Sequence, residues 1–83
     1  MTPDAFFNSY TYRLEKLKFF SINRATKVIN QKQFYILTGS KKPKMPDHKE
    51  YVYIPSRQVI VEYLGMEKGR IEFWEILQSI KFI

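Results

Sequence analysis

Apolar residues recur at helical spacing through the first twenty positions of the chain. The positions that form this face are Phe6, Phe7, Tyr10, Leu14, Leu17 and Phe20. Thr2 is a favourable helix cap, and Pro3 is favoured in a first turn. The pattern predicts a helix from about residue 3 to residue 20. Ser21 is a second cap, and the residues after it predict a short helix over 21–30.

Two stretches rich in β-branched and aromatic residues follow, at 34–40 and 50–55. In the second stretch Tyr51 and Tyr53 alternate with aliphatic residues, which is typical of a strand. Between the two stretches, residues 41–49 contain two prolines and four lysines and predict an exposed basic loop. We therefore expect an antiparallel hairpin with this loop at its tip.

The last third of the chain has two further apolar periodic segments. They predict helices over 57–64 and 68–80, interrupted at Gly65. The three segments together predict an α+β fold in one domain, residues 1–83. Its expected order is N-terminal helices, the hairpin with the basic loop, and a C-terminal helix pair.

Residues 56–77 resemble the helix-turn-helix motif of DNA-binding proteins. Ile60 and Leu64 match the inner face of a first helix, and Gly65 stands where the turn requires a positive φ. Ile71 and Trp74 match the inner face of the second helix. Val61 departs from the motif, because a small residue, usually Ala, is expected where the two helices cross.

The resemblance implies that the second helix enters the major groove of DNA. The positions it would expose are Glu67, Lys68, Gly69, Glu72 and Phe73. Glu72 and Glu75 form a stripe that would face phosphates, which argues against this role. The alternative is a packed helix pair with an interaction face that includes Phe73, Ile76 and Ile80. The apolar surface of residues 71–83 also offers an interface for a homodimer.

Composition narrows the class of protein. The chain has no cysteine, which excludes a disulfide scaffold and a thiol nucleophile. Its 83 residues include seven Phe, six Tyr and one Trp, enough rings to build a core and to leave some for a partner. The first twenty residues carry several charges and no signal-peptide pattern, and no apolar run is long enough for a membrane span. We expect a soluble intracellular, cytoplasmic protein with no membrane association.

The charge is unevenly distributed. Residues 13–50 hold ten Lys and Arg against three acidic residues, a net +7, whereas the whole chain is +6. Such a segment favours an anionic partner, nucleic acid and in particular DNA. The residues expected to bind it are Arg24, Lys27, Lys41, Lys42, Lys44, Lys49, Arg57, Lys68 and Arg70.

Residues with catalytic chemistry are sparse. His48 is the one histidine, expected to face solvent in the basic loop, and a single imidazole does not make a metal site. The segment Thr38–Lys42, TGSKK, lacks the second glycine and the helix of a phosphate-binding loop. We therefore expect no catalytic residues, metal or cofactor, and not an enzyme.

Two functions remain open from the sequence. The first is a small basic nucleic-acid-binding protein, a transcriptional regulator or accessory factor that contacts phosphates through the lysine-rich loop. Tyr51 and Tyr53 are its candidates for stacking on single-stranded bases. The second is a protein-binding inhibitor or adaptor that docks its basic and aromatic surface on a larger acidic partner.

Overall fold

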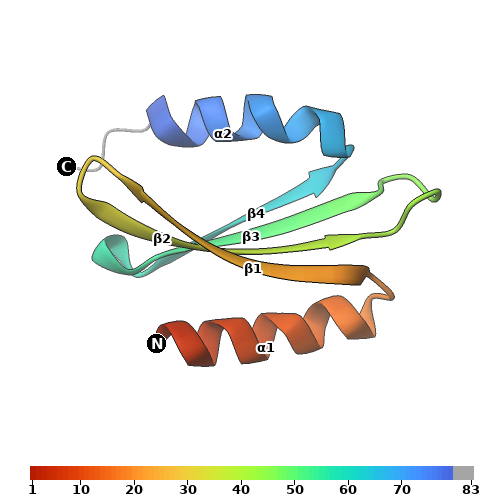
Figure 1. Cartoon of the computed structure of the whole chain (residues 1–83), viewed down its shortest axis with the longest axis horizontal. Coiled ribbons are helices and arrows are strands. Elements are labelled where there is room, and N and C mark those ends of the chain that lie inside the picture. Colours follow the sequence, from red (N-terminus) through yellow and green to blue (C-terminus); the bar gives the residue numbers. More distant parts are fainter. Residues whose placement is uncertain (80–83) are drawn as a thin grey trace.

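A four-stranded antiparallel sheet carries one helix on each face, as the computed structural model shows for residues 1–79 (Figure 1). The strands lie in sequence order. The elements are α1 (Pro3–Lys16), β1 (Phe20–Ile29), β2 (Lys32–Ser40), β3 (His48–Ile54), β4 (Val59–Gly65) and α2 (Arg70–Ser79). The protein is thus a small α+β protein, but its architecture differs from the expected one in two segments.

Helix α1 begins as predicted and ends earlier. The side chain of Thr2 accepts a hydrogen bond from the backbone N–H of Ala5 at 3.1 Å, and Pro3 is the first helical residue. The helix stops at Lys16 because Lys18 has a left-handed backbone, with φ of 67°. This turn brings Phe19, rather than Phe20, into the core.

The short helix expected over residues 21–30 is wrong, because these residues form strand β1. β1 pairs with β2 alone and lies at the sheet edge, so nearly all its side chains are exposed. An edge strand needs little apolar surface, and charged residues on it deter pairing with other chains. The mixture of apolar and charged residues in β1 therefore fits the spacing of a helix as well as it fits that of a strand.

The helix-turn-helix expected over 56–77 is also wrong. Val59–Gly65 is strand β4, paired antiparallel with β3, and α2 stands alone on its face of the sheet. The run Val59-Ile60-Val61 is β-branched and favours a strand. Gly65 does not take a positive φ. It is needed for space, since a Cβ there would lie 2.6 Å from the hydroxyl oxygen of Tyr63.

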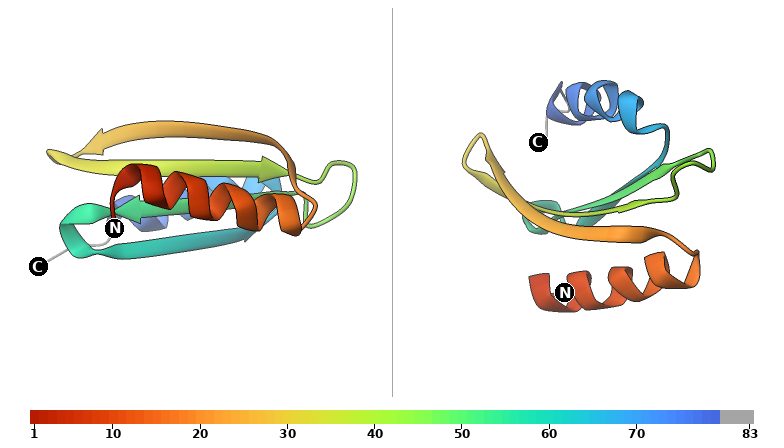
Figure 2. Two further views of the ribbon diagram at one scale, coloured as in Figure 1. Left: turned by 90° about the horizontal axis from the view of Figure 1, so that it is seen from below. Right: turned by 45° about the vertical axis from the view of Figure 1, so that its right-hand side comes forward.

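The expected hairpin is present, with β2 and β3 paired antiparallel and the basic loop between them. The two helices lie on opposite faces of the sheet (Figure 2). Alternate residues of the two central strands pack against one helix or the other. Tyr51 and Tyr53 pack under α1, where the ring centroids of Tyr10 and Tyr51 are 4.6 Å apart. Val52 and Ile54 pack under α2. Both tyrosines are buried, so the prediction that they stack on bases is wrong.

Candidate functional site

A fully buried carboxylate, that of Glu50, joins β3 to α2. Its Oε1 accepts hydrogen bonds from Nε2 of His48 at 2.7 Å and from Nε of Arg70 at 2.8 Å. Its Oε2 accepts from Nε1 of Trp74 at 2.6 Å and from Nη2 of Arg70 at 3.2 Å. We call these four residues the Glu50 cluster.

The charge of Glu50 is held by its donors. Burial raises the pKa of this carboxyl, but hydrogen bonds from Arg70, His48 and Trp74 outweigh it, and the pKa lies below its ordinary value. His48 is itself buried, so its expected exposure in a loop is wrong. A carboxylate with four donor contacts and no exposed surface is not placed to act on a substrate, and the cluster is a structural tie.

The loop between β2 and β3 is a folded unit. The backbone N–H of Lys41 donates to the carbonyl of Asp47 at 2.8 Å, and that of Lys44 donates to the carbonyl of Lys41 at 2.9 Å. The carboxylate of Asp47 accepts from the backbone N–H of Glu67 at 2.9 Å. The loop is therefore tied to the short 3-10 helix Glu67–Gly69 that leads into α2.

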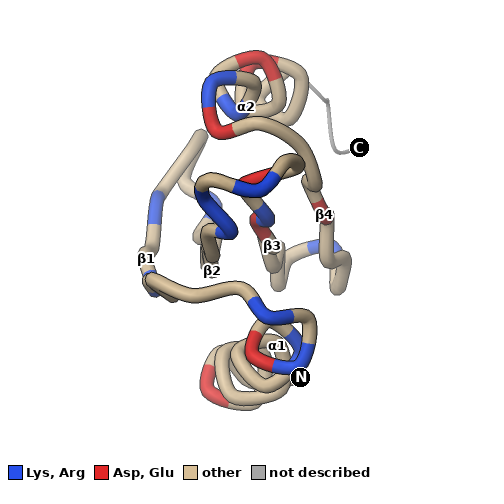
Figure 3. Tube along the Cα trace, turned by 90° about the vertical axis from the view of Figure 1, so that its right-hand side faces the viewer, with Lys and Arg blue, Asp and Glu red and all other residues tan. Residues whose placement is uncertain are grey.

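Lysines gather where this loop meets the end of α1. They line an open pocket of 330 Å³, which we call the lysine pocket; its residues are Lys18, Phe20, Lys41, Lys42, Pro43 and Lys44. Seen from this end of the molecule, lysine and arginine positions cluster over the loop, the end of α1 and the start of α2 (Figure 3).

The four pocket lysines differ in how their charge is balanced. Lys41 Nζ lies 4.6 Å from the ring centroid of Phe19, a contact that leaves its positive charge uncompensated. Lys42 is paired with Glu67, and this hydrogen bond raises the pKa of Lys42. Within residues 1–79 neither Lys18 nor Lys44 has an acidic partner. The pocket thus has excess positive charge.

A second, polar pocket lies on the other side of Phe20, towards α2. Its volume is 360 Å³, and we call it the polar pocket. The residues that line it are Phe20, Ser21, Asn23, Thr38, Gly39, Ser40, Lys42, His48 and Glu67. Phe20 and Lys42 line both pockets.

The structure separates the residues that the sequence grouped as nucleic-acid-binding. Lys41, Lys42 and Lys44 lie together in the lysine pocket, and Lys68 lies in the 3-10 helix tied to the loop. Arg57 lies in the turn between β3 and β4, at the opposite end of the sheet.

Two of the predicted residues are paired with carboxylates of the protein itself. Lys49 is buried on β3, where its Nζ lies 3.2 Å from a carboxylate oxygen of Glu62. Burial lowers the pKa of Lys49, but hydrogen bonds to Glu62 and Tyr51 outweigh it and raise the pKa overall. The guanidinium of Arg70 is committed to Glu50 within the Glu50 cluster.

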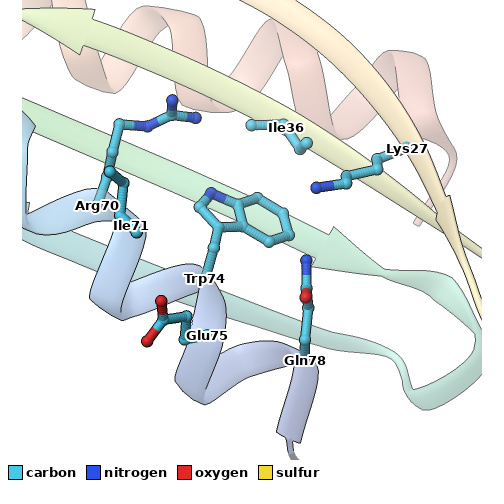
Figure 4. A pocket seen from close by; sticks show the side chains of 7 residues that line it. All are labelled: Lys27, Ile36, Arg70, Ile71, Trp74, Glu75 and Gln78. Carbon is cyan, nitrogen blue, oxygen red and sulfur yellow. The ribbon is translucent and has the colours of Figure 1, made fainter.

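Arg24 and Lys27 lie on β1 and face opposite helices. Arg24 donates to the side-chain oxygen of Asn8 at 3.3 Å and lies over the Phe7 ring on the α1 side. Lys27 Nζ lies 5.0 Å from the Trp74 ring centroid, at a shallow pocket between β1 and α2 (Figure 4). Neither residue lines the lysine pocket.

The predicted interface residues of the last helix differ in how exposed they are. Phe73 is half-buried, with its ring stacked on Tyr63 at 5.1 Å between centroids, whereas Ile76 is exposed. Ile80 lies outside the described residues. Ile71 is the most exposed large apolar residue of α2, at 69%.

Sequence reasoning missed Lys18, Phe20 and the Glu50 cluster. The first two were assigned to a continuing helix, and only the turn at Lys18 reveals their position. Glu50 had a detectable signal: on a strand whose Val52 faces the core, a period of two places Glu50 on the same buried side. Arg70 and Trp74, four residues apart in a helix, share one face.

The described part of the chain contains neither a metal-binding group of side chains nor a membrane-spanning helix. No group of three histidine or acidic side chains is placed to hold a metal ion. Neither helix has the length and apolar composition needed to cross a membrane.

Comparisons with family models, with curated proteins and with solved structures gave no significant match to the chain.

Proposed function

We propose that this protein binds nucleic acid through the end of the molecule that carries the lysine pocket. The observation that supports this best is the convergence of Lys18 from the α1–β1 connection with Lys41, Lys42 and Lys44 from the β2–β3 loop. Clustered ammonium groups contact phosphates and release counterions, which favours a polyanion over a single small anion.

The hydrogen bonds within the loop support the same proposal. Because the backbone of residues 41–47 is held by Asp47 and Ser40, the lysines need less ordering when a ligand binds. The exposed pair of Lys42 with Glu67 opposes binding weakly, because water screens an ion pair at the surface. A phosphate can displace Glu67 at small cost.

The proposed contact is with the nucleic-acid backbone. Residues 56–77 do not form a helix-turn-helix, and the polar face of α2 carries Glu72 and Glu75, which would repel the phosphates of a groove. The proposed role is therefore an accessory nucleic-acid-binding protein, with DNA and RNA both as candidate ligands. Backbone contacts position a protein without specifying sequence.

The test is binding of labelled duplex and single-stranded oligonucleotides over a range of salt concentrations. The Lys18→Gln/Lys44→Gln variant removes two charges from the lysine pocket, where neither side chain has an acidic partner. We expect weaker binding and a salt slope shallower by about 1.4–1.8 units, because each of the two lost phosphate contacts removes about 0.7–0.9.

The matched control is Lys32→Gln/Arg57→Gln, which removes the same charge at the opposite end of the sheet. It should keep the wild-type slope. Equal effects of the two variants would mean that only net charge matters and would contradict a located site. No binding of the wild-type protein at low salt would refute the function.

A second candidate function, docking on a larger acidic protein, is favoured by the outer side of α2. Ile71 and Ile76 are both exposed there, Ile76 at 58%. Most of the other exposed residues of this helix are polar. Being five positions apart, the two side chains lie on different sides of the polar stripe that contains Glu72 and Glu75, and each offers a separate apolar contact point. An Ile71→Ser/Ile76→Ser variant that loses a protein partner but keeps nucleic-acid affinity would support this function.

A further inference from the structure

Phe20 is held outward by an unusual backbone. It is 51% exposed, although its neighbour Phe19 is buried in the core. The pairing of β1 with β2 is irregular between Phe20 and Asn23, and Ser21 has a φ of 51°. A β-bulge reorients side chains, and a left-handed non-glycine residue carries a strain that the surrounding structure must offset. The result is an aromatic ring exposed between two pockets.

The pockets on the two sides of this ring differ in chemistry. The lysine pocket offers ammonium groups and suits a phosphate. The polar pocket offers hydrogen-bonding side chains from β1, β2 and the 3-10 helix; they include Asn23, Thr38, Ser40 and Glu67. The Asn23 amide donates to the Ser21 carbonyl at 3.0 Å, which leaves its side-chain oxygen directed elsewhere as an acceptor. Donors and acceptors of this kind suit the edge of a nucleobase.

We infer that the bound form is single-stranded nucleic acid, with one unstacked base on the ring of Phe20. A neighbouring phosphate occupies the lysine pocket, and the base edge faces the polar pocket. Lys42 lines both pockets and lies where backbone and base meet. This inference rests on the proposed function and specifies its ligand.

Single strands fit this arrangement because their bases are accessible. In a duplex the faces of the bases are covered by neighbouring pairs, so an aromatic ring cannot stack on them without opening the helix. Phosphates are exposed in both forms. The lysine pocket should therefore contribute to binding of both forms, and Phe20 to binding of the single strand alone.

The experiment compares Phe20→Ala with the wild-type protein by fluorescence anisotropy. The probes are labelled oligothymidine, oligouridine and a mixed-sequence duplex of equal length. We expect the Kd of the variant for at least one single strand to rise on the order of tenfold, with the duplex Kd and the salt slope unchanged. A rise for either single strand supports the inference.

Three further variants control for loss of an exposed apolar group. Phe20→Leu keeps an apolar side chain without the ring and should show the same loss, whereas Phe20→Tyr should keep the affinity. Val28→Ala, on the same strand and 63% exposed, should leave all affinities unchanged. Thermal unfolding of each variant shows whether the fold is retained, and Phe20→Leu replaces Phe20→Ala if the latter unfolds.

The outcomes separate the two proposals. Lysine-dependent binding with no effect of Phe20→Ala, or with equal effects on duplex and single strand, would overturn this inference and leave the proposed function intact. Absence of any binding at low salt would overturn both.

Discussion

Glu50 is the residue on which the contact between β3 and α2 depends. It is fully buried, and donors from three other residues satisfy both of its oxygens. A buried ion pair costs desolvation and often adds little net stability compared with an apolar replacement. Removal of one partner is different, because the other charge stays buried without compensation. The Glu50 cluster is therefore sensitive to single substitutions.

We predict that Glu50→Gln lowers the free energy of unfolding by about 3 kcal/mol, because Arg70 loses its counter-charge and the new amide places a donor against donors. The measurement is chemical denaturation followed by circular dichroism. Glu75→Gln, which changes an exposed carboxylate on α2, is the control and should change stability by less than about 0.5 kcal/mol. Similar values for the two variants would contradict the structural role of Glu50.

The lowered pKa of Glu50 also predicts a pH dependence of stability. A carboxyl whose pKa is lower in the folded protein stabilises the fold above its unfolded value of 4.5. That contribution is lost as the pH falls through 4.5 and then through the lower folded pKa. Between about pH 5 and pH 3, the wild-type unfolding free energy should decrease more steeply than that of Glu50→Gln. Parallel curves would mean that Glu50 does not titrate differently on folding.

At the scale of elements, α2 is held to the sheet by one narrow side. Trp74 and Leu77 are buried against β2 and β3, while Ile71 and Ile76 face outward. A ten-residue helix is not stable alone in water, so its structure depends on these contacts. Neighbouring residues of the helix should therefore differ sharply in their effect on stability.

Leu77→Ala and Ile76→Ala form a matched pair that tests this. Leu77→Ala should cost about 2–5 kcal/mol, because it removes buried methyl groups and leaves a cavity. Ile76→Ala should lie within about 0.5 kcal/mol of the wild-type protein, since the side chain is exposed and Ala favours helices. Urea denaturation gives both values. A large cost for Ile76→Ala would show that its outer side is covered, as in a homodimer.

At the scale of the whole molecule, one sheet separates two apolar clusters. The α1 side contains Tyr51 and Tyr53, the α2 side contains Val52 and Ile54, and all four belong to β3. Neither cluster can form without the two central strands. The helices are thus coupled through the sheet even though they lie on opposite faces (Figure 1).

This coupling predicts a single cooperative unfolding transition. Trp74 is the one tryptophan and reports on the α2 side by fluorescence, while near-ultraviolet dichroism also includes the tyrosines packed on the α1 side. The two signals should give the same denaturant midpoint. A lower midpoint for Trp74 fluorescence would show that α2 detaches before the sheet unfolds.

The sequence by itself determined the elements whose pattern is strong and local: the start of α1, the central hairpin, the basic loop and most of α2. Tertiary structure decided β1 and β4, because both are edge strands that pair with one neighbour each, and edge strands need not alternate cleanly between apolar and polar residues. It also decided the lysine pocket. Lys18 joins Lys41 and Lys44 because the turn after α1 lies beside the loop between β2 and β3, and spacing along the chain contains no record of that proximity.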